Sequence, residues 1–228
     1  MYNNHKTLAI IPARSGSKRL PNKNMQKIMG VSLIGWAGNC LSKLPWIDKK
    51  VISTDSDAYG REGKRYGLEF LKRPEALSQG EHRSIIPTLI HALQTFNMPY
   101  DIILVIEPTS PLRKPEDIEG VVELFCNIPQ AEAVLTMSGL PKRYHPERLT
   151  ETDVADRLTF TATEPYKEQL YHWNGICYAY KPDALFEQRT ILPRFSYIYH
   201  IDRPVVNIDD KDDLEFARFL MERQIYGG

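Results

Sequence analysis

Along this chain, short continuous apolar runs alternate with longer stretches in which apolar residues recur at helical spacing. A short apolar run closed by a proline, a glycine or polar residues is typical of a buried strand, whereas apolar residues every three to four positions indicate a helix with one packed face. The apolar runs predict strands at residues 7–11, 51–53, 69–71, 102–106, 133–137, 176–180 and 197–201. The helical spacing predicts helices at residues 32–44, 57–66, 86–93, 115–125 and 212–223.

The alternation of these elements predicts an α/β fold. Strands and helices that follow one another through short connections favour a doubly wound, mostly parallel sheet. At 228 residues, the chain fits a single domain over 1–228. Ligands of such sheets bind outside the carboxyl ends of the strands. The polar loops that begin at Pro12, Thr54 and Glu107 each follow a predicted strand, so we expect them to share one rim of the sheet.

The alternation is interrupted between residues 140 and 173. This stretch is polar, contains Pro141, Pro146 and Pro165, and has few signals of a buried strand. A loop of this length inside a compact domain is usually functional or forms an interface. We therefore expect residues 140–173 to be an inserted arm.

Composition excludes several classes of function. Lys plus Arg and Asp plus Glu are balanced at 29 each, so no global charge favours nucleic acid or an anionic membrane. Cys40, Cys126 and Cys177 lack metal-type spacing and predict free thiols in a reducing compartment. The polar N-terminus has no leader-like segment, and no apolar run is long enough to span a membrane. We therefore expect a cytoplasmic protein.

The loop after the first strand is the most informative segment. Residues 11–24 read IPARSGSKRLPNKN, with Arg14, Lys18, Arg19 and Lys23 close together around small residues whose backbone amides an anion can approach. Several fixed cations with backbone donors suit a triphosphate, whose charge must be offset during attack at phosphorus. The segment does not match the GxxxxGK[ST] phosphate loop. A solvated basic loop is the alternative interpretation.

This segment resembles the N-terminal signature of the acylneuraminate cytidylyltransferase family, usually IPARGGSK..P.KN. The resemblance continues in family order over nearly the whole chain, through STDSD at 53–57, Lys72–Pro74, EPTSPLR at 107–113, Asn174–Gly175 and NIDD at 207–210. It implies a Rossmann-like nucleotidyltransferase that transfers a cytidylyl group from CTP to the anomeric hydroxyl of an acidic ulosonate and releases pyrophosphate. It also implies a homodimer, with residues 140–173 as the dimerisation and sugar-site arm.

The resemblance assigns roles to individual residues. It implies CTP contacts from Arg14, Ser15, Gly16, Lys23, Asn24, Arg73 and Ser84, with Arg14, Lys18 and Lys23 offsetting charge during catalysis. It implies sugar contacts from Glu107, Thr109, Ser110, Arg113, Asn174 and Gly175, and from Arg148 reaching across the dimer. Arg113 could instead pair with Glu116.

Two departures from the family pattern concern the sugar site. Glu107 stands where the family usually has Gln, which changes the charge near the sugar. Residues 171–173 (Tyr-His-Trp) stand where the family usually has arginines. Both departures leave the identity of the acidic sugar open.

The NIDD segment predicts the metal site. Mg²⁺, or Mn²⁺ in its place, prefers a few carboxylate oxygens together with phosphate oxygens and water. The family supplies an Asp-x-Asp pair, which falls here on Asn207 and Asp209. Asp209 is the predicted catalytic metal ligand, and the uncharged Asn207 is at best auxiliary. Alternatively, Asp209 and Asp210 merely cap the last helix, a common role for Asp.

Two other functions are compatible with the same residues. Asp55-x-Asp57 resembles the metal motif of nucleotide-sugar glycosyltransferases, although in the cytidylyltransferase reading Asp55 orients the nucleotide-site loops. Alternatively, Asn207 and Glu107 could indicate a protein that binds CTP without catalysis. Incubation with CTP versus a CMP-sugar separates the synthetase from the glycosyltransferase, because only a synthetase releases pyrophosphate. A non-catalytic protein would bind CTP and show no turnover with any ulosonate.

Overall fold

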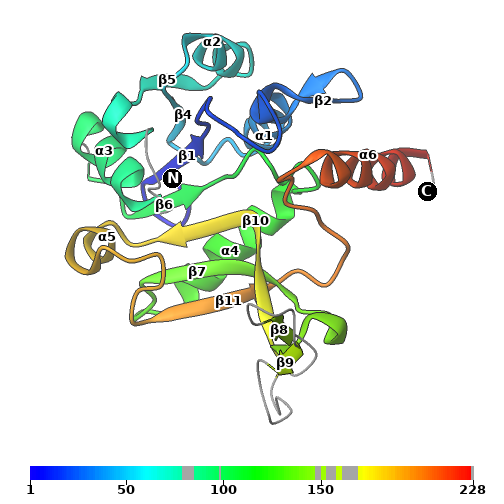
Figure 1. Cartoon of the computed structure of the whole chain (residues 1–228). Coiled ribbons are helices and arrows are strands. Elements are labelled where there is room, and N and C mark those ends of the chain that lie inside the picture. The colour runs from blue at the N-terminus through cyan, green and yellow to red at the C-terminus, as the bar shows by residue number, and fades with distance from the viewer. Residues whose placement is uncertain (79–84, 98, 147–149, 153–157, 161–168, 227–228) are drawn as a thin grey trace.

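The computed structural model describes residues 1–78, 85–97, 99–146, 150–152, 158–160 and 169–226. Its centre is a seven-stranded sheet with the strand order β11-β7-β10-β6-β1-β4-β5 (Figure 1). Within this sheet only β10 runs antiparallel to its neighbours, so the predicted mostly parallel sheet is confirmed. Its strands are β1 (Thr7–Pro12), β4 (Lys49–Thr54), β5 (Glu69–Lys72), β6 (Ile102–Val105), β7 (Ala133–Gly139), β10 (Tyr171–Tyr180) and β11 (Ser196–His200).

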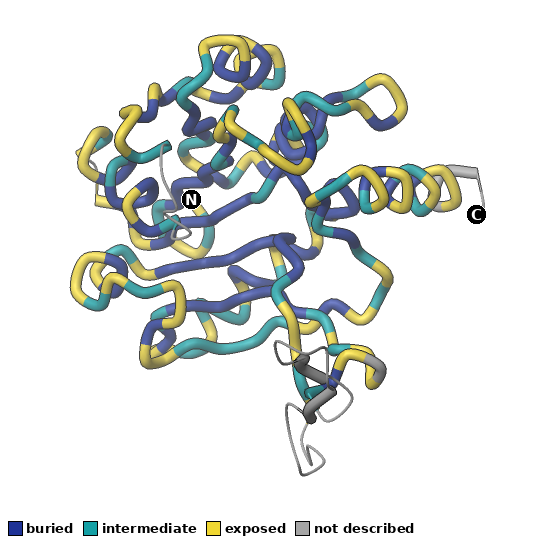
Figure 2. Tube along the Cα trace, viewed as in Figure 1, coloured by how far each residue is buried: buried dark blue, intermediate teal, exposed yellow. Residues whose placement is uncertain are grey.

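Helices cover both faces of the sheet, as expected for a doubly wound fold. Along β1, Ala9 and Ile11 pack in the same core cluster as residues of α1, α2 and α4, whereas Leu8 and Ile10 pack with α3 and α5. Because both faces are covered, the central strands β1 and β6 are almost entirely apolar and buried, whereas β5 and β11 at the two edges are more exposed (Figure 2). The α-helices are α1 (Leu33–Ser42), α2 (Asp57–Arg65), α3 (Ile86–Phe96), α4 (Pro115–Asn127), α5 (Pro182–Gln188) and α6 (Lys211–Tyr226).

The strand order reverses beside β1. The chain winds from β1 through β4 to the edge strand β5, then crosses through α3 to β6 on the other side of β1. Such a switch point opens a crevice between the loops that leave the carboxyl ends of its two strands. Here those loops follow β1 and β6, and they contain the residues that the sequence singles out.

A third core cluster attaches the C-terminal part of the chain to this rim. Leu20 from the loop after β1, Leu112 from the loop after β6, and Ile208 pack with Leu214 of α6. The small hairpin of β2 (Lys27–Ile28) and β3 (Val31–Ser32) contributes to the same cluster. The NIDD segment is therefore held against both loops.

Some elements differ from the expectation. Strand β10 begins at Tyr171, earlier than the predicted 176, because its register shifts between Trp173 and Tyr178 and the polar Asn-Gly pair at the shift interrupts the apolar run. Helix α5 was not predicted, since it is too short to show helical spacing. Three short 3-10 turns complete the described elements: Lys23–Met25, Glu75–Leu77 and Lys142–Tyr144.

The predicted arm is described in part. Residues 147–149, 153–157 and 161–168 lie outside the described residues. Within the described part, β8 (Thr150–Thr152) and β9 (Leu158–Phe160) form a two-stranded antiparallel sheet of their own. This pair lies apart from the central sheet (Figure 1). A role in dimerisation stays a prediction.

The described residues bear on two predictions from the sequence, the lack of a membrane-spanning segment and the free thiols. No helix among them combines the length and the apolar character needed to cross a membrane. All three cysteines are free; Cys40 and Cys177 are buried, and Cys126 is half-buried. Burial raises the pKa of the Cys40 thiol to about 11, so this thiol stays protonated and unreactive at neutral pH.

Candidate active site

The loop after β1 is anchored to the loop after β4. Ser15 donates to Asp55 twice, from its backbone N–H to Oδ1 at 2.9 Å and from its hydroxyl to Oδ2 at 2.7 Å. Burial alone would raise the pKa of Asp55, but these hydrogen bonds outweigh it and bring the pKa below its ordinary value. Asp55 is therefore an ionised anchor that orients the loop, as the cytidylyltransferase reading expects.

Asn24 braces the same loop from within, and Arg73 binds the end of β4 beside it. Both are buried; Asn24 donates to the carbonyl of Arg14 at 3.2 Å, and Arg73 donates to the carbonyl of Ser53 at 2.7 Å. Burial lowers the pKa of Arg73 to about 10, so it is still a cation at neutral pH. Asn24 thus contributes to the shape of the loop and Arg73 to the end of β4, and the contact of either residue with a nucleotide stays a prediction.

The outer surface of the loop is open. Arg14, Gly16, Lys18 and Arg19 are exposed. A Cβ atom added at Gly16 would have no neighbour within 4 Å, so nothing packs over the backbone at this point. The loop therefore offers cations and accessible backbone amides to an anion in the crevice.

The loop meets the NIDD segment directly. Lys23 Nζ lies 2.9 Å from Oδ1 of Asp209, and Arg19 Nη2 lies 3.2 Å from Oδ2. Burial would raise the pKa of Asp209, but the hydrogen bond and charge of Lys23, with Arg19, lower it. The structure thus joins a predicted phosphate contact to the predicted metal ligand, although 186 residues separate Lys23 from Asp209.

Asp209 and its neighbour Asp210 have different tasks. Asp210 accepts from the backbone N–H of Asp213 at 3.0 Å, and Asp213 accepts in return from the N–H groups of Asp209 and Asp210. This reciprocal pattern is a helix cap. The side chain of Asp210 therefore caps α6, which leaves the carboxylate of Asp209 directed at the loop cations.

The loop after β6 is buried rather than open. Thr109 and Ser110 are 7% and 0% exposed, and the hydroxyl of Ser110 donates to the carbonyl of Asn174 at 2.8 Å. Asn174, 2% exposed, accepts from Thr136 at 2.7 Å and donates to Ser138 at 3.1 Å. These predicted sugar residues lie together and build the wall of the site. Direct contact with a sugar stays a prediction.

Arg113 does not pair with Glu116, and its contact with a sugar stays a prediction. Its side chain is buried and donates to three backbone carbonyls, those of Glu107, Gly175 and Ile176. Burial lowers the pKa of its guanidinium from the ordinary value. Pairing with Glu116 is replaced by this contact set, because the loop turns Arg113 inward against β10. Arg113 thus joins the loop after β6 to the strand beside it.

Glu107 and Asn207 contact each other. Asn207 Nδ2 donates to Glu107 Oε2 at 2.9 Å. Burial raises the pKa of Glu107, opposed by the hydrogen bond from Asn207 and by the charges of Arg113 and Lys23. Sequence reasoning treated the two residues separately and missed this pair, since only the tertiary fold brings positions 100 residues apart into contact.

Two predicted site residues, Ser84 and Arg148, lie outside the described residues. Among the residues that the structure describes, no group of three or more His, Cys, Asp or Glu side chains could hold a metal ion by itself.

The metal motif of a glycosyltransferase is not assembled. Asp55 is engaged by Ser15, whereas Asp57 forms a surface ion pair with Lys72 at 2.6 Å and begins α2. The two carboxylates therefore serve separate local contacts. This geometry does not favour the glycosyltransferase alternative.

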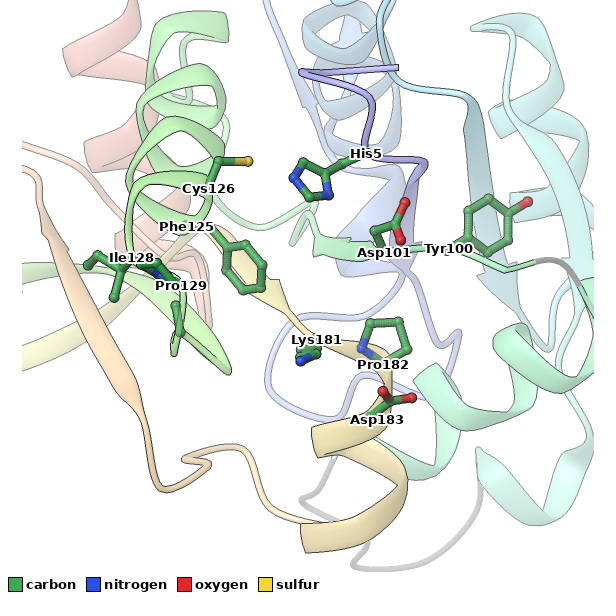
Figure 3. Close-up of a pocket in the computed structure, with 11 residues that line it drawn as sticks. His5, Tyr100, Asp101, Phe125, Cys126, Ile128, Pro129, Lys181, Pro182 and Asp183 are labelled. Atoms are coloured by element: carbon green, nitrogen blue, oxygen red, sulfur yellow. The ribbon is translucent and has the colours of Figure 1, made fainter.

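A cavity of about 260 Å³ lies at the opposite end of the sheet (Figure 3). Its lining residues precede β1, β6 and β7 or follow the antiparallel β10, and they include His5, Asp101, Phe125 and Lys181. Ligands of parallel α/β sheets bind at the carboxyl ends of the strands. This cavity is therefore separate from the candidate active site.

The anchoring of the first loop can be tested with Ser15→Ala. A folded-state pKa below the unfolded value stabilises the protein above the unfolded pKa, and this contribution is lost as the pH falls through the folded pKa. Without the Ser15 hydroxyl, the pKa of Asp55 should rise, and acid unfolding should begin at a higher pH. Carboxyl ¹³C NMR titration of Asp55 measures the shift. Ser17→Ala is the matched control in the same loop, and an equal pKa of Asp55 in both variants would contradict the assignment.

Comparisons with known proteins agree with this architecture. A family model described as "Cytidylyltransferase" matches residues 8–224. The N-acylneuraminate cytidylyltransferase of Escherichia coli is 29% identical over 227 residues, which cover 96% of this chain and 53% of that protein. The chain thus spans about half the length of that relative. The CMP-N,N'-diacetyllegionaminic acid synthase of Legionella pneumophila is also 29% identical, over 94% of this chain and 96% of that protein.

A solved structure shows the same fold. A CMP:2-keto-3-deoxy-manno-octonic acid synthetase complexed with CTP superposes with a TM-score of 0.74 and 18% identity, covering 96% of this chain and 99% of that one. At this identity the likeness concerns the fold. It supports a Rossmann-like nucleotidyltransferase architecture for the central sheet and its helices.

Proposed function

The chain belongs to the cytidylyltransferase family, and from that premise we propose that it transfers a cytidylyl group from CTP to the anomeric hydroxyl of an acidic ulosonate sugar, releasing pyrophosphate. One observation carries the proposal. The cationic loop after β1 and the late acidic segment meet through Lys23 and Asp209 at the switch-point crevice. A nucleoside triphosphate lying there would contact both at once.

The reaction requires positioning and charge stabilisation more than covalent chemistry. The anomeric oxygen of the sugar attacks the α-phosphorus of CTP in line, the bond from that phosphorus to the bridging oxygen of the pyrophosphate breaks, and pyrophosphate leaves. Negative charge builds on the phosphoryl oxygens in the transition state. Arg14, Lys18 and Lys23 lie on or next to the loop after β1, at the carboxyl end of that strand, and would offset this charge.

Mg²⁺ is the cation that we propose for this site, with Mn²⁺ as its substitute. The carboxylate of Asp209 fits such an ion, because it lies on the exposed rim, ionised, beside a cation expected to bind the triphosphate. When bound, the ion would supply Lewis-acid charge to the phosphates. Asn207 contributes at most an uncharged oxygen, since its amide is engaged by Glu107.

The acceptor class is proposed from the named relatives. The Escherichia coli and Legionella pneumophila proteins are named for N-acylneuraminate and N,N'-diacetyllegionaminic acid, sugars that carry a carboxylate beside the anomeric carbon. We propose that this chain accepts a sugar of the same class in the cytoplasm, a compartment compatible with its three free cysteines. We also propose a homodimer formed through residues 140–173.

The decisive experiment is pyrophosphate release from CTP with a panel of acids: N-acetylneuraminate, legionaminate, pseudaminate and octulosonate. We expect release with at least one acid and none without an acceptor. CTP binding without release for every acid would favour the non-catalytic alternative. Hydrolysis or transfer from a CMP-sugar without any reaction of CTP would favour the glycosyltransferase.

A further inference from the structure

The two departures from the family pattern are one structural unit. Glu107 replaces a usual Gln and so adds a negative charge. Asn207 replaces the first Asp of the usual Asp-x-Asp pair and so removes one. In the structure Asn207 Nδ2 donates to Glu107 Oε2 at 2.9 Å. The contact therefore holds one carboxylate and one amide, with the carboxylate on the loop after β6 instead of on the NIDD segment.

The surroundings hold this pair in a fixed geometry. Gly175 has a φ of +70°, and a Cβ there would lie 2.6 Å from Glu107 Oε2 and 2.8 Å from Asn207 Nδ2. Only a glycine permits the backbone to approach so closely in this conformation. Beside the pair, the N–H of Ile208 donates to the carbonyl of Thr109 at 2.8 Å, which ties the two segments together.

The carboxylate of Glu107 lies against the segment that contains the proposed cation ligand, because its partner Asn207 is two residues before Asp209. Its charge interacts with those of Lys23 and Asp209, which are themselves in contact at 2.9 Å. Oε2 accepts from Asn207, whereas Oε1 has no hydrogen-bond donor among the described residues. A largely buried carboxylate that keeps one oxygen free of hydrogen bonds is a suitable donor for a divalent cation.

We propose that Glu107 is the second carboxylate ligand of the divalent cation and that Asn207 is its positioning residue. The inference rests on the proposed function, since it concerns the same cation and the same CTP. It explains how the cation site can work with an uncharged residue at position 207, because the negative charge missing from Asn207 is supplied by Glu107. Asp209 and Glu107 then form the carboxylate pair, and the phosphates and water complete the shell.

Mn²⁺ binding measured by electron paramagnetic resonance, in the presence of CTP, tests this assignment without depending on turnover. Glu107→Gln keeps the shape and can still accept from Asn207, so the fold should remain stable. We expect it to weaken Mn²⁺ binding on the order of tenfold or more, since it removes a charged ligand. The double variant Glu107→Gln/Asn207→Asp returns one carboxylate to the pair and should recover most of the lost affinity.

Three controls separate the possible outcomes. Glu116→Gln removes an exposed carboxylate at the start of α4 and should bind Mn²⁺ with the affinity of the wild-type protein. CTP affinity in EDTA should be equal for the wild-type protein and Glu107→Gln.

Wild-type Mn²⁺ affinity in Glu107→Gln, or a double variant that binds Mn²⁺ as weakly as the single one, would overturn the assignment. If Asp209→Ala still weakens binding, the proposed function stands; if neither residue matters, both proposals fall.

Discussion

Asp209→Ala is expected to reduce pyrophosphate release by on the order of 10²- to 10³-fold, while Asp210→Ala leaves turnover nearly unchanged. The reason is the division of tasks between the two neighbours. Asp209 directs its carboxylate at Lys23 and Arg19 in the crevice, where the CTP phosphates are expected to lie. Asp210 instead accepts from the N–H of Asp213 and caps α6.

Stability should respond in the opposite order. Loss of an N-cap costs about 1 kcal/mol, so Asp210→Ala should lower the free energy of unfolding by about that amount. The ion pairs of Asp209 are exposed, and such pairs contribute roughly 0–1 kcal/mol. Steady-state pyrophosphate release and urea unfolding of both variants measure the two effects. Similar turnover in the two variants would remove Asp209 from the reaction and with it the main support for the metal site.

Arg113→Met is expected to be the most destabilising single change at the site, by about 3 kcal/mol or more. The buried guanidinium donates to the carbonyls of Glu107, Gly175 and Ile176. A buried acceptor left without its donor costs about 1–3 kcal/mol, and methionine satisfies none of the three. Since whole domains are stable by only about 5–15 kcal/mol, this loss is a large fraction of the total.

The midpoint of urea unfolding checks this expectation. Arg218→Met is the matched control, because Arg218 lies on α6 and bonds at the surface to Glu215 and to the carbonyl of Lys27. It should change the free energy of unfolding by less than about 1 kcal/mol. If Arg113→Met is equally mild, the loop after β6 does not depend on the buried guanidinium.

Both predictions depend on features that the sequence suggested only in outline. The motif at 107–113 marked the loop as important, yet Arg113 was assigned to the sugar or to Glu116. Within the structure its partners are backbone carbonyls, two of them on a strand more than 60 residues away in sequence, and the sugar contact stays a prediction. No local pattern signals a hydrogen bond to a distant carbonyl. The alternative that the NIDD segment caps the last helix is confirmed for the side chain of Asp210. The carboxylate of Asp209 instead contacts Lys23 and Arg19.

By itself, the sequence determined most elements of the central sheet, five of its helices and the kind of fold. Continuous apolar runs such as residues 102–106 suffice to predict strands buried on both faces, and helical spacing with proline at 115 suffices for α4, because periodicity and capping are local properties. The motif series likewise indicated the cytidylyltransferase family, to which the chain belongs.

Only the tertiary structure decided how the site residues combine. It joined Lys23 to Asp209 and Glu107 to Asn207, pairs separated by 186 and 100 residues. It also turned Thr109, Ser110 and Asn174 inward to form the wall of the site. The physical reason is that charge pairing and burial depend on which strand ends and loops the sheet order brings together, and that order is set by packing over the whole domain.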